Sequence, residues 1–387
     1  MYDTIYLHAG LPKTGSTHVQ NGLQHLSMEG LLGRVAYPVV SPELGSGNGA
    51  IVSALLRSAE VDADVEARLE ACLHELLAAA QGQSPDLLIS SEHFFFATVE
   101  ALSAFRRMLL RHARTVKLVV CVRPLRDWTW SLYMQMVKAH LLSDDFDVAW
   151  LARWGDTWLP NFANLDRFDA EAIAFPYRDR GLLADLLAAI GEDEGLARHF
   201  PEGRVNRSLG ATELGIVRKV NAAFADEVLS RAISDHYTIT WPEDPTAAFP
   251  AACEADFRGF AAAFEDRLEP LQGATMRAVK ELLFADAPLA ANARDKAGHD
   301  DRDLLGIALS EIRRHQDFYR LDGQQCHAMK REAQALEPTR DFFDPIHYLL
   351  MYPDLCIPEI DPELHYRNHG REEGRASGLK GKHTKRS

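Results

Sequence analysis

The stretch "TIYLHAGLPKTGST" near the start of the chain constrains the fold more than any other. Its apolar run predicts a buried strand over residues 4–9, and apolar side chains at helical spacing predict a helix over residues 16–27. Gly10 and Gly15 lie between them, so strand, glycine turn and helix follow in the order typical of phosphate-binding loops. Lys13 stands before the second glycine, whereas a nucleotide-binding P-loop has its lysine after that glycine. The segment therefore predicts a phosphate site and leaves its ligand open.

Further apolar runs, "PDLLIS", "TVKLVVCV" and "AIAFP", alternate with segments of helical periodicity. The valine-rich run is unbroken, as expected for a strand that is buried on both faces of a parallel sheet. This alternation predicts an α/β protein: a three-layer P-loop-type fold with a central parallel sheet flanked by helices. After about residue 205 the pattern becomes mostly helical, with apolar spacing over 211–233, 254–284 and 302–319.

The chain has 387 residues, more than one average domain needs. We predict an α/β domain over 1–235 and a helical extension over 236–335 that packs on the same domain. Residues 338–377 are dense in Tyr, His and Pro and predict a small separate module. The basic tail over 378–387 is expected to be disordered.

The composition narrows the class of protein. A formal net charge of −14 argues against a general nucleic-acid binder, which would be basic. The five cysteines are scattered without a C-x-x-C pair, no run approaches the ~18 apolar residues of a membrane span, and the start carries no signal-peptide pattern. We therefore expect a cytoplasmic protein with reduced thiols and no transmembrane segment.

The chemistry of the loop leaves two classes of enzyme to separate. Backbone N–H groups, the Lys13 ammonium and the hydroxyls of Ser16 and Thr17 suit a phosphate group. A kinase also needs a carboxylate for its metal at the end of a neighbouring strand. The run "VVCV" ends instead in Arg123, which disfavours a kinase, although Glu92 after "LLISS" keeps that alternative open.

Two motifs carry a resemblance to a known family. The stretch "LPKTGST" resembles the 5′-phosphosulfate loop of sulfotransferases that use PAPS (3′-phosphoadenosine 5′-phosphosulfate). That family's second signature is an arginine at a strand end and a serine eight residues later, which bind the 3′-phosphate; "RPLRDWTWS" supplies Arg123 and Ser131. An arginine fork also suits bidentate phosphate binding on chemical grounds. The resemblance, closest to bacterial members, covers about residues 1–235.

The resemblance implies roles for further residues. It implies that the cofactor is held by the loop and the start of the following helix: Lys13, Thr14, Gly15, Ser16, Thr17 and His18. His18 stands where some members carry a tryptophan on the adenine, and Tyr177 in "FPYRDR" is expected to contact that ring. Arg204 or Arg207 is expected to cover the cofactor.

The family also implies a catalytic base after the strand between the two motifs. Glu92 takes that position in "ISSEHF", and the neighbouring His93 is the alternative. Strand alternation points the two side chains to opposite faces, so we expect only one of them to face the sulfuryl group. Lys13 is expected to stabilise the leaving phosphate during a transfer that needs no metal.

The expected reaction moves the sulfuryl group of PAPS to an acceptor hydroxyl and leaves PAP (adenosine 3′,5′-bisphosphate). A glycan or glycolipid acceptor is expected for two reasons. The first is a set of side chains that suits a sugar site, with core packing as the alternative: Trp128, Trp130, Tyr133, Gln135 and Lys138. The second is "FDPIHYLLMYPDL", which resembles modules attached to bacterial glycan-modifying enzymes. The alternatives are a nucleotide-dependent P-loop kinase and a non-catalytic glycan-binding protein on a sulfotransferase scaffold.

Overall fold

The structure is a computed structural model. It describes residues 1–39, 47–57, 62–80, 84–168, 170–201, 208–241 and 247–285, with parts of 304–312 and 365–370. The chain divides into two compact units. Unit 1 comprises residues 1–133, 144–206 and 249–292, and unit 2 comprises residues 134–143, 207–248 and 293–387. In the part of the chain that the structure describes, no helix has the length and apolarity to cross a lipid bilayer.

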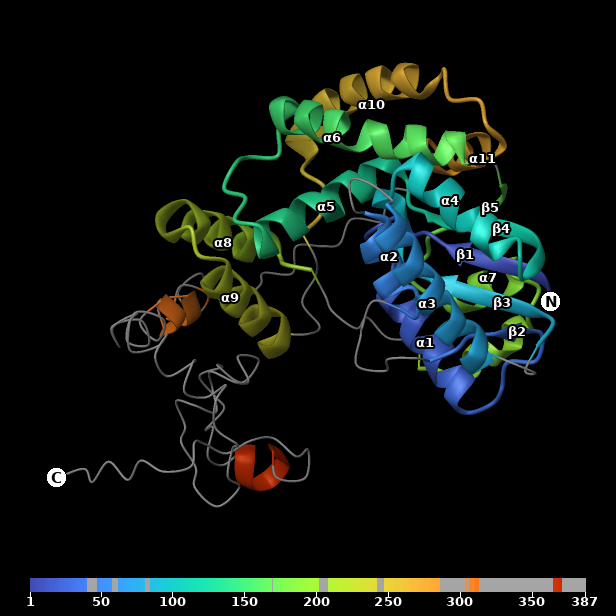
Figure 1. Ribbon diagram of the computed structural model, residues 1–387. Helices are drawn as coiled ribbons and strands as arrows, with labels where there is room; N and C mark the ends of the chain where they lie inside the picture. The colour runs from blue at the N-terminus through green and yellow to red at the C-terminus, as the bar shows by residue number, and fades with distance from the viewer. Residues whose placement is uncertain are drawn as a thin grey trace. The chain divides into compact units, whose positions relative to one another are not determined.

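Unit 1 is built on a five-stranded parallel sheet with the strand order β2-β3-β1-β4-β5 (Figure 1). The strands are β1 (Tyr2–His8), β2 (Val35–Ala36), β3 (Asp86–Ser90), β4 (Ala113–Val122) and β5 (Glu171–Pro176). Every neighbouring pair is parallel, which confirms the predicted α/β class with a parallel sheet. All carboxyl ends therefore lie at one edge of the sheet, with β1 in the middle.

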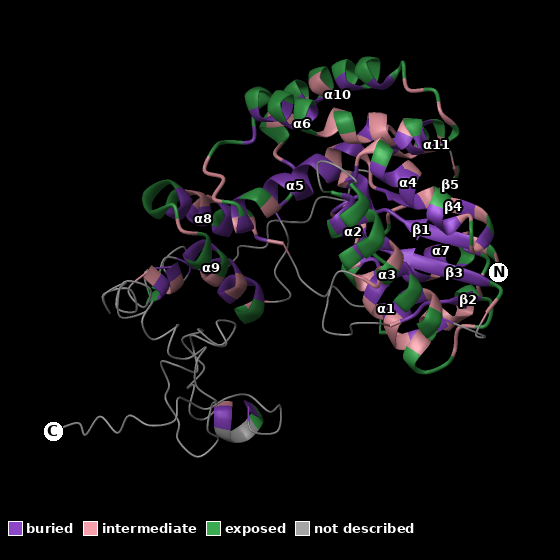
Figure 2. Cartoon of the chain, viewed as in Figure 1, coloured by how far each residue is buried: buried purple, intermediate pink, exposed green. Residues whose placement is uncertain are grey.

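Two helices, α1 (Ser16–Met28) and α7 (Leu182–Ala189), cover one face of the sheet. Their leucines form a buried cluster with side chains from every strand, among them Tyr6, Leu88 and Val119. Figure 2 shows β3 buried along its length, β1 and β4 buried towards their carboxyl ends, and helices exposed on their outer sides. The helices α4 (Val99–Leu109) and α11 (Ala274–Leu283) contribute nothing to that cluster and instead contact β4.

The remaining helices of unit 1 refine the sequence prediction. They are α2 (Ala50–Leu56), α3 (Ala63–Ala80), α6 (Val148–Arg167), α10 (Glu254–Leu268) and, up to Tyr133, α5 (Leu125–Ala139). Neither α2, α6 nor the two-residue strand β2 was predicted from the sequence. Within 254–284 the helical pattern resolves into α10 and α11, separated by a turn at Gly273, whose N–H donates to Asp166 Oδ1 at 2.6 Å.

Unit 2 contains α8 (Ala211–Phe224) and α9 (Glu227–Thr240). The break between them falls at Ala225, whose left-handed backbone (φ 49°) ends α8, and Asp226, whose side chain caps α9. The final residues of α5 belong to this unit, where Asn221 Nδ2 donates to the carbonyl of Val137 at 2.8 Å. The predicted module over 338–377 and the tail over 378–387 lie outside the described residues, apart from 365–370.

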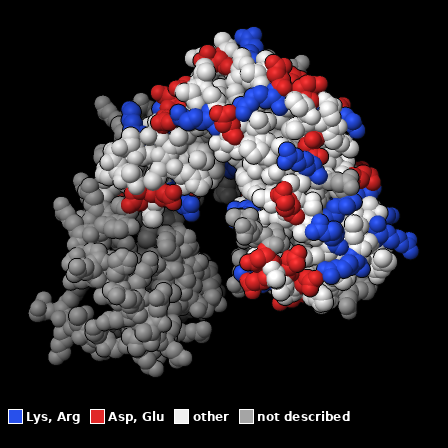
Figure 3. Space-filling view, turned by 45° about the horizontal axis from the view of Figure 1, so that its top comes forward, with Lys and Arg blue, Asp and Glu red and all other residues white. Residues whose placement is uncertain are grey.

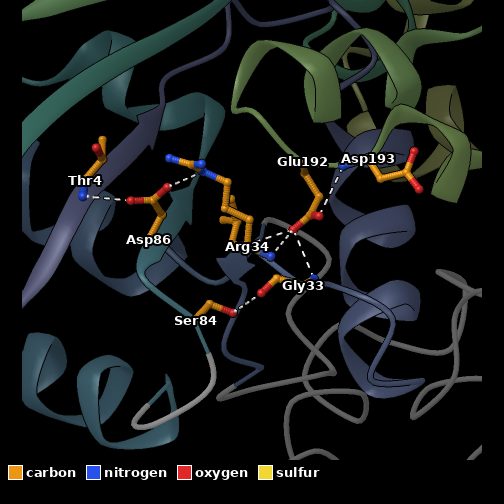
Figure 4. A network of polar contacts seen from close by, with 8 residues as sticks. Thr4, Gly33, Arg34, Ser84, Asp86, Glu192 and Asp193 are labelled. Atoms are coloured by element: carbon orange, nitrogen blue, oxygen red, sulfur yellow. Dashed lines mark hydrogen bonds and ion pairs between the residues drawn. The ribbon is translucent and has the colours of Figure 1, made fainter.

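A polar network fixes the amino edge of the sheet (Figure 4). The buried Asp86 carboxylate accepts from the N–H of Thr4 and from Arg34 Nε, both at 2.9 Å. The Glu192 carboxylate accepts from three successive backbone N–H groups, those of Gly33, Arg34 and Val35, at 3.1, 2.8 and 3.0 Å. The entries to β1, β2 and β3 are thus tied together at the edge opposite the strand ends that carry the candidate site.

Charges on the surface are mixed in sign. Figure 3 shows acidic and basic side chains interspersed over the face in view. Ion pairs such as Arg111–Glu70 at 2.6 Å and Arg153–Asp144 at 2.8 Å join partly exposed side chains. Exposed pairs of this kind contribute little to stability, so the fold depends on its apolar core.

Candidate active site

The predicted site residues follow the carboxyl ends of four adjacent strands. The loop 9–15 follows β1, Glu92 follows β3, Arg123 follows β4 and Tyr177 follows β5. After β1 the chain forms β2 and β3 on one side of β1 and then β4 and β5 on the other, which makes the end of β1 a topological switch point. Open parallel sheets bind ligands at such points.

The loop is anchored by its carbonyl groups. Three successive carbonyls, at positions 12–14, each accept a hydrogen bond from β4 or from the residues that follow it. The donors are Trp128 Nε1 to Pro12 at 2.6 Å, Arg123 Nη1 to Lys13 at 3.4 Å and Cys121 Sγ to Thr14 at 3.6 Å. Thr14 Oγ1 donates within the turn to the carbonyl of Leu11. These three carbonyls therefore tie the loop to β4 and to α5.

The start of α1 is shaped to receive an anion. Lys13 (φ 63°) and Gly15 (φ 77°) adopt left-handed backbone, a geometry that turns successive N–H groups into a concavity. No side chain caps α1 and no acidic residue lies in its first turn. Among the described residues, none accepts from the N–H groups of Gly15, Ser16 or Thr17, and the buried Ser16 Oγ has no hydrogen-bond partner. Buried polar atoms without partners are rare in folded proteins, so a bound anion fits this turn.

Arg123 and Tyr177 form the neighbouring wall of the site. The Arg123 guanidinium carbon lies 4.5 Å from the centroid of the Tyr177 ring. A Cβ atom added to Gly15 would lie 3.4 Å from Tyr177 Cε2, so this ring borders the turn itself. The buried Arg123 Nε has no acceptor among the described residues, although Nη1 is engaged. The pair therefore joins a fixed cationic fork to an aromatic face beside the loop.

Glu92 lies against the other side of the loop. A Cβ atom added to Gly10 would be 3.4 Å from both Cα and Cβ of Glu92. Glu92 and His93 open the short 3₁₀ helix η1 (Glu92–Phe96), because Ser91 Oγ accepts from the His93 N–H at 3.3 Å and ends the strand. The strand alternation expected for this pair does not apply, since successive residues of a 3₁₀ helix differ by about 120°. Both side chains are partly buried, and His93 Nδ1 has no partner among the described residues.

Four predicted cofactor residues remain: Ser131, Thr17, His18 and Arg207. Ser131 is buried on α5, and no described hydrogen bond joins it to the loop or to Arg123. Thr17 is exposed, and the His18 ring lies 5.3 Å from the ring of Phe200. Arg207, like Arg204, lies outside the residues that the structure describes.

The aromatic residues of α5 belong to the core rather than to a sugar site. Trp128, Trp130 and Tyr133 are 0%, 8% and 1% exposed. Trp128 packs edge-on against Trp158 at 5.2 Å and donates to the loop. Phe96, four residues after Glu92 on η1, and Trp158, on α6, are instead partly exposed, and their rings lie 5.4 Å apart.

A buried polar cluster at the ends of β1 and β3 was not predicted from the sequence. His8 Nδ1 lies 2.8 Å from Ser90 Oγ, and Gln20 Nε2 donates to the same oxygen at 3.1 Å. Burial lowers the pKa of His8 to about 4, so this ring is neutral near pH 7. The sequence did contain a signal for this cluster: a polar residue ends each of two apolar runs, and a third polar residue lies on the predicted helix between them.

Comparisons with protein-family models, with curated proteins and with solved structures found no match for this chain. Within the described ranges, no group of three or more His, Cys, Asp or Glu side chains is arranged to hold a metal ion.

Proposed function

We propose that the protein is a PAPS-dependent sulfotransferase that acts on a hydroxyl of a carbohydrate or glycoconjugate. The observation that carries this proposal is that two anion-binding elements lie together at the carboxyl edge of the sheet. One is the uncapped turn at the start of α1, and the other is Arg123, held against Tyr177. A ligand with a phosphate at each of two positions and an aromatic base between them suits this arrangement. The P-loop-type identity of the fold is part of the same proposal.

Each element has a defined part in binding. The N–H groups of residues 14–17 and the Lys13 ammonium hold the 5′-phosphate, with the Ser16 hydroxyl as a further donor. Arg123, with Ser131, takes the 3′-phosphate and so distinguishes PAPS from ATP. Tyr177 and His18 border the adenine, and Arg207 covers the cofactor.

Glu92 acts as the general base in the proposed transfer. It takes the proton of the acceptor hydroxyl, whose oxygen forms a bond to sulfur while the bond from sulfur to the 5′-phosphate oxygen breaks. Lys13 stabilises the negative charge that develops on that phosphate oxygen. His93, next to Glu92, is the alternative base. The products are the sulfated acceptor and PAP, and no metal takes part in this scheme.

The acceptor is proposed to lie beside Glu92, against Phe96 and Trp158. Partly exposed aromatic rings offer flat apolar faces of the kind that ligand sites use, and the nearby carboxylate supplies the polar contact. We place the reaction in the cytoplasm, in keeping with scattered cysteines of which Cys72, Cys121 and Cys253 are free thiols.

Thermal-shift titration tests the cofactor. PAP should raise the melting temperature of the wild-type protein, and Mg-ATP should raise it far less. Arg123→Ala should weaken PAP binding roughly 10- to 100-fold, because a charged hydrogen bond contributes about 1.5–3 kcal/mol. Arg114→Ala, at the partly exposed ion pair with Asp3, is the matched control and should bind PAP like the wild type. Stabilisation by Mg-ATP but not by PAP would instead indicate a kinase.

A transfer assay from labelled PAPS to a glycan panel tests the reaction and identifies the acceptor. Glu92→Gln should abolish transfer while PAP still binds, because the amide cannot accept the proton. Turnover that persists in this variant removes Glu92 from the mechanism. PAP binding without transfer by the wild type, across the panel, would favour a glycan-binding protein on a sulfotransferase scaffold.

A further inference from the structure

A chain of three buried polar side chains connects the elements that meet at the site. His8 ends β1, Ser90 ends β3 and Gln20 lies in the second turn of α1. Ser90 Oγ bonds His8 Nδ1 at 2.8 Å and accepts from Gln20 Nε2 at 3.1 Å. The three residues are 1%, 0% and 3% exposed, so water cannot replace these partners. A buried polar group that loses its partner costs about 1–3 kcal/mol, which makes this arrangement strongly preferred.

Each of these three side chains lies next to one element of the proposed site. His8 precedes the loop that starts at Ala9, and Gln20 belongs to the helix whose first turn faces the ligand. Ser90 precedes Glu92 by two residues, and the Ser91 N–H donates to the carbonyl of His8 at 3.0 Å. One hydroxyl oxygen therefore links the loop, the anion-binding helix and the segment that carries the base.

The segment 47–49 closes over Ser90 from the remaining side. Asn48 Oδ1 accepts from the Ser90 N–H at 2.8 Å, and the Gly49 N–H donates to the Ser90 carbonyl at 3.0 Å. A Cβ atom added to Gly47 would lie 2.3 Å from the carbonyl oxygen of Ser90, so the close approach of the two backbones requires glycine. Ser90 is thus bonded through its N–H, its carbonyl and its hydroxyl, and its position is fixed from three directions.

We propose that the His8–Ser90–Gln20 network is a positioning device that sets Glu92 relative to the phosphate-binding loop. The inference rests on the proposed function. The loop itself is anchored separately, through its carbonyls, to β4 and α5. Loss of the network therefore shifts the base segment more than the PAP-binding turn. Misplacement of a reacting group by about 1 Å can lower a rate by as much as 100-fold.

Ser90→Ala and Gln20→Leu, alone and combined, test this inference. Each single variant should lower kcat about tenfold or more, while the dissociation constant for PAP changes less than about twofold. The double variant should lose little beyond either single variant, because both act through one oxygen. Ser234→Ala is the control: it removes an equally buried hydroxyl, in α9, that donates to the Ser230 carbonyl, and it should keep wild-type kcat.

Hydrogen exchange in the absence of ligand gives a second readout that does not depend on catalysis. Ser90→Ala and Gln20→Leu should each speed amide exchange in residues 90–96 and at the His8 end of the loop. Ser234→Ala should leave both segments protected. The inference is overturned if PAP affinity falls in parallel with kcat, if the double variant is additive, or if exchange changes in one segment alone. If the wild type transfers no sulfuryl group, the proposed function fails, and exchange still decides whether the network couples the two segments.

Discussion

The protonation of His8 should control much of the acid sensitivity of unit 1. The ring is buried at the end of β1, and the loss of water around it lowers its pKa from 6.5 to about 4. In the unfolded chain the same ring takes up a proton at its ordinary pKa. Between these two values the unfolded state binds one proton more than the folded state, so the free energy of unfolding falls as the pH drops from 6.5 towards 4.

The size of the effect follows from the two pKa values. The gap between 6.5 and about 4 corresponds to about 3 kcal/mol, at about 1.4 kcal/mol per factor of ten. Between pH 7 and pH 5, where the titration is incomplete, the free energy of unfolding should fall by about 2 kcal/mol through this residue alone.

Urea unfolding at pH 7 and at pH 5, followed by tryptophan fluorescence, measures this quantity. Five of the six tryptophans belong to unit 1, so the signal reports the unit that contains His8. His8→Gln carries no titrating ring, and its difference between the two pH values should be smaller than that of the wild type by about 2 kcal/mol. His140→Gln, which removes an exposed histidine, should keep the wild-type difference. An unchanged pH dependence in His8→Gln would refute the reasoning.

Three further substitutions test how the loop and the sheet are held. Trp128→Phe keeps an aromatic ring and loses the 2.6 Å hydrogen bond to the Pro12 carbonyl. We expect a free energy of unfolding about 1–3 kcal/mol lower in urea and weaker PAP binding by calorimetry. Unchanged PAP binding would disprove the anchoring role of Trp128. Gly15→Ala should lower the melting temperature and the affinity for PAP. The new Cβ atom would lie 2.5 Å from Leu182 Cδ2, and the backbone φ of 77° at this position favours glycine. A variant that melts and binds PAP like the wild type would contradict this geometry. Glu192→Ala removes the acceptor of three backbone N–H groups at the amino edge of the sheet. It should lower the free energy of unfolding by about 1–2 kcal/mol and leave the affinity for PAP unchanged. A change in PAP affinity would show that the amino edge is coupled to the site at the carboxyl edge.

Local sequence signals predicted the elements around the loop because each has its own physical cause. Unbroken apolar runs mark β1, β3 and β4, and glycines mark the turn before α1. The helix α6 was missed although its buried face is regular, since Pro160 and several polar residues interrupt its pattern. The helix η1 was missed for a different reason: Ser91 caps it, and a cap within an apolar run is hard to distinguish from the continuation of a strand.

The sequence by itself determined the candidate anion-binding groups. Glycines permit the left-handed turn, and Lys13 and Arg123 carry the charge, whatever the rest of the chain does. Only the tertiary structure decided that these groups meet, because the strand order β2-β3-β1-β4-β5 brings residues over a hundred positions apart to one edge. It also decided that Trp128 serves the core and the loop, and that His8, Ser90 and Gln20 share one buried oxygen. Burial and hydrogen bonding between distant segments are properties of packing, and they leave no local pattern in the sequence.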